Sequence, residues 1–330
     1  MYKVLMPLLI WGCTDKSDTG EIESPKWNVF ADQIGEGMLL SAWSQDSRML
    51  AVGGGMDGTG PGVRVIVDGD TVCTETLLED RALWWIHGST PDDYYMVGEQ
   101  GTILHSVNGK IFREDVDTTA TLYGVWADEN GNVTAVGGDV SANTGEIWRR
   151  TEGEWSLFIS ELEGVAFKVW RNWVVGDRMA WYLAGDTADE MVARPPGERL
   201  LTVRGSSDDD VWAVGGSASA VVLHWHDGEW EDVSTSGLSL PLMGIWTDAD
   251  EDIWVSGMSG TQGVSGDEIA EWTIPDFPVS AEHFHAVWKH EEDVFFLGGN
   301  MMASAGPWYG SILHYGEPRN ATQLTTCSDD

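Results

Sequence analysis

Two acidic segments of the chain have the side-chain spacing of a loop that binds a hard cation. Three oxygen-bearing residues alternate with single residues in each segment: Asp248, Asp250 and Asp252 in one, and Asp128, Asn130 and Asn132 in the other. Ca²⁺ prefers about six to eight oxygen ligands, and alternate side chains of a tight loop can supply three of them. Neither segment has the distal Glu of a complete EF-hand loop. Ca²⁺ is therefore a candidate ligand, and a solvated β-turn whose side chains bond to the local backbone is the alternative.

Methionine and aromatic side chains gather in glycine-rich segments at residues 53–62, 257–266 and 298–310, and residues 137–145 form a similar segment without them. The residues that could contact a partner are Met56, Met258, Met301, Met302, Trp308 and Tyr309. Flexible thioethers and aromatic rings suit an adaptable contact surface, and loops often carry function. The alternative is that these side chains fold back over the rim of the core.

The elements that must position these residues recur along the chain. Each repeat has an apolar strand that usually ends in an aromatic residue, then an acidic turn and a second strand that ends in glycine; residues 86–98 and 203–215 align without a gap. The aligned glycines are Gly53, Gly98, Gly137, Gly185, Gly215, Gly257 and Gly298. Their mean spacing of about 41 residues matches one four-stranded propeller blade. We therefore predict an all-β fold, a seven-bladed β-propeller.

The two ends of the chain are expected to close this ring. Trp27 lies 16 residues before Trp43, which is also the distance from an outer strand to the next inner strand at Trp230 and Trp246. The last repeat lacks an outer strand of its own, so we predict that the N-terminal strand completes blade 7 and removes the open edge. In blade 4, only 30 residues separate Gly185 from Gly215. We expect its outer strand to be shortened or lost at residues 194–197.

The repeats also indicate which ring positions belong to the core. Five of them end their first strand in tryptophan: Trp43, Trp126, Trp170, Trp246 and Trp288. We interpret these rings as packing between blades. His87 and Arg204 replace that tryptophan in two other repeats and are candidate binding residues, with simple repeat drift as the alternative.

A histidine recurs in the third strand of three repeats, at His105, His224 and His314. Equivalent residues of different blades point the same way and are spread around the ring, so they do not converge on one point. A structural role is therefore favoured over a metal site.

The N-terminus has the pattern of a bacterial lipoprotein signal. An apolar run follows Lys3 and ends in Ile10-Trp11-Gly12, directly before Cys13. We expect residues 1–12 to be a signal peptide, Cys13 to be the lipidation site and residues 13–25 to be a flexible tether. This predicts an exported protein that is lipid-anchored to the outer membrane or cell surface, on the periplasmic or extracellular face. An ordinary buried strand is the alternative for the apolar run.

The remaining cysteines are an even pair. The propeller is expected to span residues 26–318, followed by a C-terminal tail at residues 319–330. Cys73 falls in the outer strand of blade 1, next to the blade from which the tail bearing Cys327 departs. In an oxidising compartment this placement favours a disulfide between Cys73 and Cys327.

Acidic residues outnumber basic ones three to one. The chain has 54 Asp and Glu against 18 Lys and Arg, a formal net charge of -36. Nucleic acid is excluded as a partner because phosphate binding needs a basic surface. The turns between first and second strands and the outer hairpins share one face of a propeller, and they carry 21 of the 54 acids. We therefore expect one acidic face and one face of glycine-rich loops.

The segment from Tyr95 to Phe112 resembles the photosystem II assembly factor-like propellers and the wider sialidase-like group, with residues 106–112 similar to a degenerate Asp-box. Residues 211–216 and 222–230 resemble the Trp-rich repeats of exported bacterial propeller proteins. The resemblance covers residues 27 to about 316 and implies the fold, not a function.

The function expected from these features is that of a non-catalytic, lipid-anchored cell-envelope propeller that serves as a protein-binding or assembly scaffold. A carbohydrate-binding, lectin-like module is the alternative, and a sialidase-like glycoside hydrolase is a third. The hydrolase would need clustered arginines, whereas Arg204 is the one arginine at the aligned inner-strand position. No residue is assigned as catalytic, since none of the common catalytic motifs occurs. The expected partner is an envelope or extracellular protein or a glycan, with membrane contact only through the lipid anchor.

Overall fold

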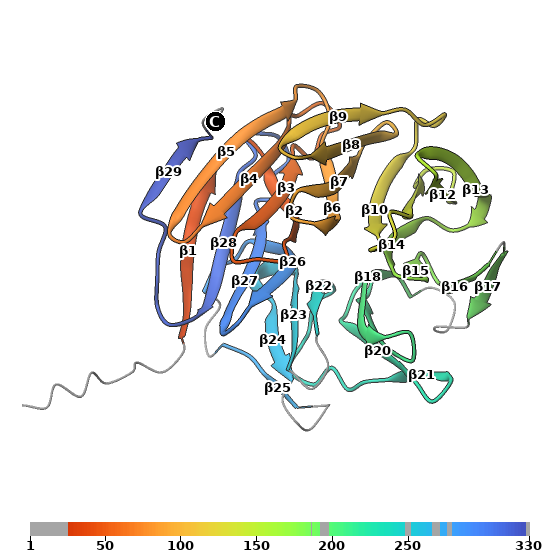
Figure 1. The fold of residues 1–330 in the computed structure, drawn as a ribbon. Helices are drawn as coiled ribbons and strands as arrows, with labels where there is room; N and C mark the ends of the chain where they lie inside the picture. The colour runs from red at the N-terminus through yellow and green to blue at the C-terminus, as the bar shows by residue number, and fades with distance from the viewer. Residues whose placement is uncertain are drawn as a thin grey trace, which may run out of the picture.

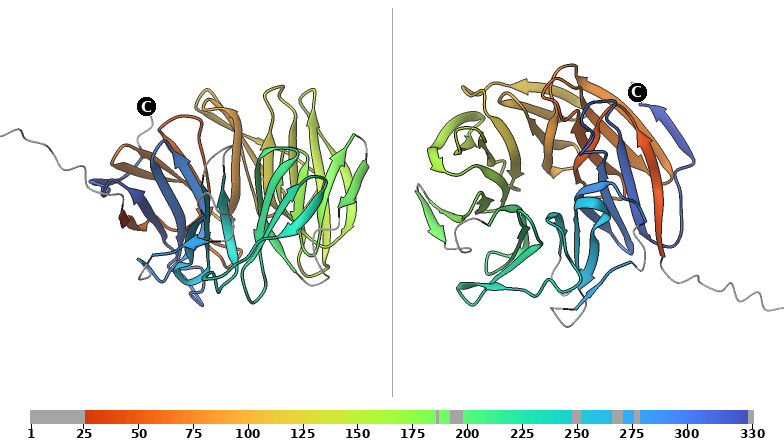
Figure 2. Two further views of the ribbon diagram at one scale, coloured as in Figure 1. Left: turned by 90° about the horizontal axis from the view of Figure 1, so that it is seen from below. Right: turned by 180° about the vertical axis from the view of Figure 1, so that it is seen from behind.

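The computed structural model describes residues 26–185, 187–191, 198–247, 252–265, 271–275 and 279–327. Seven β-sheets are arranged as blades around a central axis (Figure 1). Seen from behind, the blades again form one ring (Figure 2). The predicted seven-bladed β-propeller is therefore confirmed.

The strands of each blade run antiparallel from the central axis outward, except for the last strand of blade 1. Blade 1 contains β2 (Met38–Trp43), β3 (Met49–Gly54), β4 (Gly62–Asp68), β5 (Thr71–Leu78) and β29 (Gln323–Thr326). Blade 2 contains β6 (Leu83–Thr90), β7 (Asp93–Gly98), β8 (Thr102–Val107) and β9 (Lys110–Glu114). Blade 3 contains β10 (Thr121–Ala127), β11 (Val133–Asp139), β12 (Thr144–Thr151) and β13 (Glu154–Glu163). Blade 4 contains β14 (Ala166–Trp170), β15 (Trp173–Gly176), β16 (Ala180–Ala184) and β17 (Thr187–Met191).

The remaining three blades follow in chain order. Blade 5 contains β18 (Leu200–Ser207), β19 (Asp210–Gly215), β20 (Val221–His226) and β21 (Glu229–Asp232). Blade 6 contains β22 (Leu242–Trp246), β23 (Ile253–Gly257), the 3-10 turn η1 (Met258–Gly260), β24 (Gln262–Ser265) and β25 (Trp272–Thr273). Blade 7 contains β26 (His283–His290), β27 (Asp293–Gly299), β28 (Gly310–Gly316) and β1 (Lys26–Ile34).

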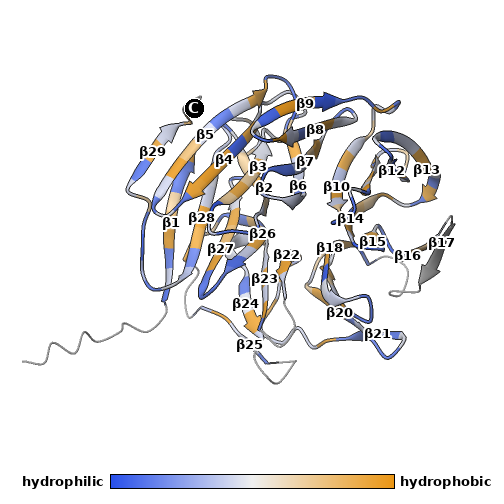
Figure 3. Ribbon diagram, in the orientation of Figure 1, coloured by the Kyte–Doolittle hydropathy of each residue, from blue (hydrophilic) through white to orange (hydrophobic). Residues whose placement is uncertain are grey.

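The core lies between neighbouring blades. All six residues of β3 are buried, because a second strand is covered on both of its faces, whereas most residues of the outer strand β13 are exposed or half-buried. Hydropathy follows the same gradient: β22 is mainly apolar and β21 is mainly hydrophilic (Figure 3). A strand covered on both faces is apolar without alternation, which explains the continuous apolar runs that end in glycine.

The repeated glycine has a steric cause, and this corrects the sequence alignment of blade 4. A Cβ at Gly98 would lie 2.2 Å from the carbonyl oxygen of Ala82 at the start of the innermost strand. In blade 4 the equivalent glycine is Gly176, where a Cβ would lie 2.1 Å from the carbonyl oxygen of Val165. The predicted Gly185 lies instead in the β16–β17 turn, where a Cβ would meet no atom within 4 Å. Gly176 stands 39 residues before Gly215, so blade 4 has an ordinary length. It keeps a short outer strand, β17, before residues 194–197.

The ring is closed by the N-terminal strand, as predicted. β1 pairs antiparallel with β28, with Asn28 opposite His314. The predicted disulfide between Cys73 and Cys327 is also present, with a Cα–Cα distance of 4.9 Å. The sequence analysis treated residues 319–330 only as a tail, but residues 323–326 form β29, a fifth strand parallel to β5. Among the described residues, none belongs to a helix that is long and apolar enough to span a bilayer.

The disulfide should contribute to stability because it joins cysteines 254 residues apart in sequence. A long closed loop restricts the unfolded chain strongly, so we expect Cys327→Ser to lower the free energy of unfolding by about 2–4 kcal/mol. Urea unfolding of both proteins under oxidising conditions measures the difference. Dithiothreitol should lower the midpoint of the wild type to that of the variant, and equal midpoints under oxidising conditions would contradict the expectation.

Candidate functional site

Equivalent side chains occupy one position in each of the seven blades, and all of them except Trp288 line a cavity at one mouth of the central channel. We call them the mouth ring: Trp43, His87, Trp126, Trp170, Arg204, Trp246 and Trp288. The His87 and Trp126 rings stack with centroids 3.9 Å apart, and the Trp126 and Trp170 rings follow at 5.8 Å. The Arg204 guanidinium lies 3.4 Å from the centre of the Trp246 ring. The predicted inter-blade packing of the tryptophans is therefore observed, and His87 and Arg204 belong to the same ring.

His87 is held as a neutral imidazole. Its Nδ1 accepts a hydrogen bond of 3.1 Å from the backbone N–H of Ala127, so the proton resides on Nε2. Burial lowers the pKa of His87 to about 3, and the positive charge of Arg204 acts in the same direction. Arg204 in turn donates from Nε to the Thr247 carbonyl oxygen at 3.2 Å.

A cavity of about 200 Å³ at the mouth is lined by residues of all seven innermost strands. Trp85 lines this cavity, and the Lys168 Nζ lies 4.1 Å from the Trp85 ring centre and donates to the Tyr123 carbonyl oxygen at 2.6 Å. Burial lowers the pKa of Lys168 to about 7. Lys168 could not be predicted as a site residue from the sequence, because one lysine in an apolar strand gives no periodic signal.

A wider depression, which we call the basin, opens on the same face beside the channel mouth. It has a volume of about 710 Å³ and extends over blades 2 to 5, with Gln45 of blade 1 at its edge. Gln45, His87 and Trp126 line both the basin and the channel cavity, so the two are continuous. The turns between first and second strands form much of its wall, which identifies this face as the one predicted to be acidic.

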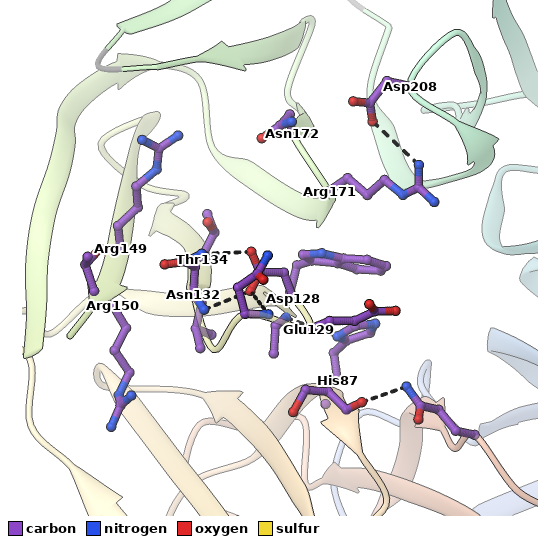
Figure 4. A pocket seen from close by; sticks show the side chains of 18 residues that line it. His87, Asp128, Glu129, Asn132, Thr134, Arg149, Arg150, Arg171, Asn172 and Asp208 are labelled. Atoms are coloured by element: carbon purple, nitrogen blue, oxygen red, sulfur yellow. Dashed lines mark hydrogen bonds and ion pairs between the residues drawn. The ribbon is translucent and has the colours of Figure 1, made fainter. Parts of the chain in front are cut away.

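The basin combines acidic turns with three arginines. Arg149 and Arg150 project in opposite directions from β12, and Arg171 reaches toward Asp208 with a closest N–O distance of 4.0 Å (Figure 4). Arg150 is fixed by two hydrogen bonds to Glu114, at 2.8 and 3.1 Å. These arginines give no repeat signal in the sequence, because no arginine recurs at the equivalent positions of the other blades.

Glu114 links blades 2 and 3 beneath the basin wall. Besides Arg150 it accepts hydrogen bonds from Trp155 Nε1 at 2.6 Å and contacts His105 Nδ1 at 2.8 Å. Burial alone would raise its pKa, but the hydrogen bonds from His105, Arg150 and Trp155 lower it to about 2. Glu114 is therefore a carboxylate at neutral pH, and it holds Arg150 at the basin wall.

The candidate cation loop at residues 128–132 forms part of this wall. Asp128 Oδ1 accepts the backbone N–H groups of Asn130 and Asn132 at 2.8 and 2.9 Å, and Oδ2 accepts Asn132 Nδ2 at 2.9 Å. Burial would raise the pKa of Asp128, but these hydrogen bonds lower it. Both carboxylate oxygens thus face donors of their own loop, which is the geometry of the alternative interpretation as a β-turn.

The second candidate cation loop is only partly described. Asp252 is exposed, whereas Asp248 and Asp250 lie outside the described residues. In the described part of the chain, no three His, Cys, Asp or Glu side chains are grouped closely enough to hold a metal ion.

The predicted contact residues of the glycine-rich loops lie on the face opposite the basin. Met302 is 68% exposed, while Met56, Met258 and Met301 are half-buried. Trp308 is only 8% exposed and packs over Gly55, which agrees with the alternative interpretation at this position. Tyr309 is half-buried and donates its hydroxyl proton to Glu282 Oε1 at 2.7 Å. The loop at residues 298–310 thus follows the alternative interpretation in part, with its tryptophan folded inward.

The three repeated histidines have structural contacts. Each bonds through Nε2 to the aspartate that begins the second strand of its own blade: His105 to Asp93 at 2.8 Å, His224 to Asp210 at 2.7 Å and His314 to Asp293 at 2.6 Å. They lie in blades 2, 5 and 7. The three histidines therefore do not converge on one point, in agreement with the prediction from the sequence.

Comparison with known proteins places the fold but not the activity. No protein-family profile and no curated protein matches this chain. Among solved structures it is similar to YCF48 bound to D1 peptide, with 16% identity and a TM-score of 0.64 over 90% of this chain and 98% of that one. It is also similar to a catalytically inactive virginiamycin B lyase from Staphylococcus aureus with quinupristin, with 12% identity and a TM-score of 0.69 over 89% and 99%. At these identities the likeness establishes the propeller fold alone.

The neutral state of His87 predicts a loss of stability in acid. Between pH 6.5 and about 3 the unfolded chain binds a proton at this residue and the folded protein does not, so acidification favours unfolding. His87→Trp places at this position the residue that five other blades carry. It should reduce the loss of unfolding free energy on acidification by up to about 1.4 kcal/mol per pH unit. Urea unfolding at several pH values from neutral to acidic measures it.

A matched control is His226→Gln. Hydrogen bonding to Glu231 raises the pKa of this partly exposed histidine, so its removal should not reduce the acid sensitivity. An unchanged pH dependence in His87→Trp would contradict the lowered pKa, because it would mean that His87 binds its proton equally well in the folded and unfolded states.

Proposed function

We propose that the protein is a non-catalytic binding scaffold that takes a segment of another polypeptide into the basin. The observation that carries the proposal is the mixed lining of the basin. Guanidinium groups, amides, carboxylates and the half-buried rings of His87 and Trp126 line about 710 Å³, a volume typical of ligand sites. A polypeptide presents donors, acceptors and apolar side chains in the same alternation, so it matches such a surface better than a ligand of one chemical type.

Individual groups of the basin are available for such contacts. Arg171 is exposed, and the nearest carboxylate oxygen of Asp208 lies 4.0 Å from its guanidinium. Glu129 and Asn130 are exposed on the adjacent turn. An incoming N–H group could therefore bond to Glu129, and an incoming carbonyl to Arg171 or Asn130.

The comparisons support this proposal at the level of architecture. A propeller of similar structure, YCF48, has been solved with D1 peptide bound. The low identity of 16% transfers no individual contact, so the argument for a polypeptide ligand rests on the basin itself.

The proposal is tested by selecting ligands from a phage-displayed library of random peptides and measuring their affinity by fluorescence anisotropy. Arg171→Ala should weaken the selected peptides about 10- to 100-fold, because it removes hydrogen bonds from a charged donor. Arg178→Ala is the matched control, since this exposed arginine belongs to the same blade but lies in the β15–β16 loop on the opposite face. Selected peptides that bind Arg171→Ala and the wild type equally would exclude the basin as their site.

We further propose that the scaffold is lipid-anchored through Cys13 and acts in the cell envelope. Cys13 and the tether at residues 13–25 lie outside the described residues, so the support is the sequence pattern that precedes the cysteine. Cys13→Ser should abolish incorporation of an alkyne-labelled fatty acid and move the protein from the membrane fraction to the supernatant. A wild-type protein that carries no label would refute the anchor while leaving the basin proposal intact.

A further inference from the structure

A second, smaller cleft lies between blades 1 and 2 and is separate from both the basin and the channel. Its volume is about 300 Å³. Strands β3 and β4 form one wall, β7 and β8 form the other, and the turn before β7 and the β8–β9 hairpin form the rim. The proposed function leaves this cleft without a role.

One wall of the cleft contains two arginines, and they differ in whether neighbouring side chains hold the guanidinium group. The Arg64 guanidinium is fixed, because Nε and Nη2 contact Glu75 Oε1 and Nη1 donates to the Tyr94 hydroxyl oxygen. Since that oxygen already accepts, the hydroxyl proton of Tyr94 remains available for donation. Arg48 has an exposed side chain, and no described residue forms a hydrogen bond or ion pair with its guanidinium. The cleft therefore contains the Arg48 guanidinium, which forms no hydrogen bond or ion pair with a described residue, beside the Arg64 guanidinium, which is held by Glu75 and Tyr94.

The opposite wall holds a buried hydroxyl that lacks a partner. Ser106 is fully buried, and its Oγ forms no hydrogen bond with the described residues. Ser106 stands opposite Tyr94 in the register of β7 and β8, so the two side chains share one face of the sheet. A buried polar group without a partner is unfavourable, and a ligand hydroxyl in the cleft would satisfy it.

The rest of the lining limits the ligand further. Leu50, Ile66 and Pro91 supply apolar surface, while Asp92 and Asn108 stand exposed at the rim. A dianion such as phosphate would be repelled by the Asp92 carboxylate and by the net charge of -36, whereas a single carboxylate can pair with Arg48. Asp92 and Asn108 are suited to neutral hydroxyl groups.

We propose that this cleft binds a small hydroxylated carboxylate of monosaccharide size, of which a hexuronate is the simplest example. The carboxylate pairs with Arg48 and accepts the Tyr94 hydroxyl proton, and ring hydroxyls bond to Ser106 and the rim residues. Its apolar ring face rests on the aliphatic side chains of the walls. This site does not depend on the proposed binding of a polypeptide in the basin.

Calorimetric titration of the full chain with methyl β-D-glucuronide and methyl β-D-glucoside tests the proposal, because the two probes differ only at the carboxylate. The size of the probe predicts a Kd on the order of 1 mM for the glucuronide. Arg48→Ala should weaken it about 10- to 100-fold, and Ser106→Ala about 5- to 10-fold. Arg113→Ala, which removes an exposed arginine of β9 outside the cleft, should leave the Kd unchanged.

Thermal unfolding separates a binding role of Ser106 from a structural one. Because its hydroxyl has no partner in the described structure, Ser106→Ala should leave the melting temperature unchanged or raise it while it weakens the glucuronide. Equal binding of glucoside and glucuronide, absence of binding at about ten times the predicted Kd, or glucuronide binding that survives Arg48→Ala would overturn the proposal. Equal binding of N-acetyl-aspartate would overturn the requirement for hydroxyl groups.

Discussion

Apolar packing between neighbouring blades is the interaction on which the rest of the structure depends. A four-stranded blade is apolar on both faces, so it is stable only when another blade covers each of them. A buried tryptophan removes about 150–250 Å² from water, which corresponds to about 4–6 kcal/mol before entropy is counted. Trp43, Trp170 and Trp288 of the mouth ring are buried and each make this contribution. The binding surfaces exist because this packing fixes the turns between first and second strands at one face.

A ring of this kind has one vulnerable seam, where the first and last blades meet. Phe30 of β1 and Trp288 of β26 belong to one apolar cluster with Met49 and Val72 of blade 1, so the N-terminal strand completes blade 7 and packs against its neighbour at once. The same seam carries the disulfide of Cys73 and the fifth strand β29. Pairing, packing and a covalent bond therefore all act where an open ring would separate.

Features that follow from repetition could be predicted from the sequence, and features that follow from single residues could not. The period, the closing strand and the disulfide all derive from positions compared between blades. Gly185 was aligned in place of Gly176 because both follow an apolar strand, and only the carbonyl oxygen of Val165 distinguishes them. The inward packing of Trp308 depends on the space above Gly55, and the pattern of residue types in the sequence does not reveal this space. The basin arginines and Lys168 could not be predicted as site residues for the same reason, since each occurs at its position in one blade only.

The charge of the chain constrains which partners can use the basin. A net charge of -36 repels acidic partners at long range, but this repulsion decays over about 8 Å at physiological ionic strength. Within that distance, contacts are decided by the local groups, and three arginines line the basin. Arg150 is already neutralised by Glu114, so its contribution to a ligand is shape and hydrogen bonding more than charge. A segment that is neutral or basic overall and carries an isolated acidic side chain meets both conditions: it approaches without long-range repulsion, and it finds the Arg171 guanidinium in the basin wall.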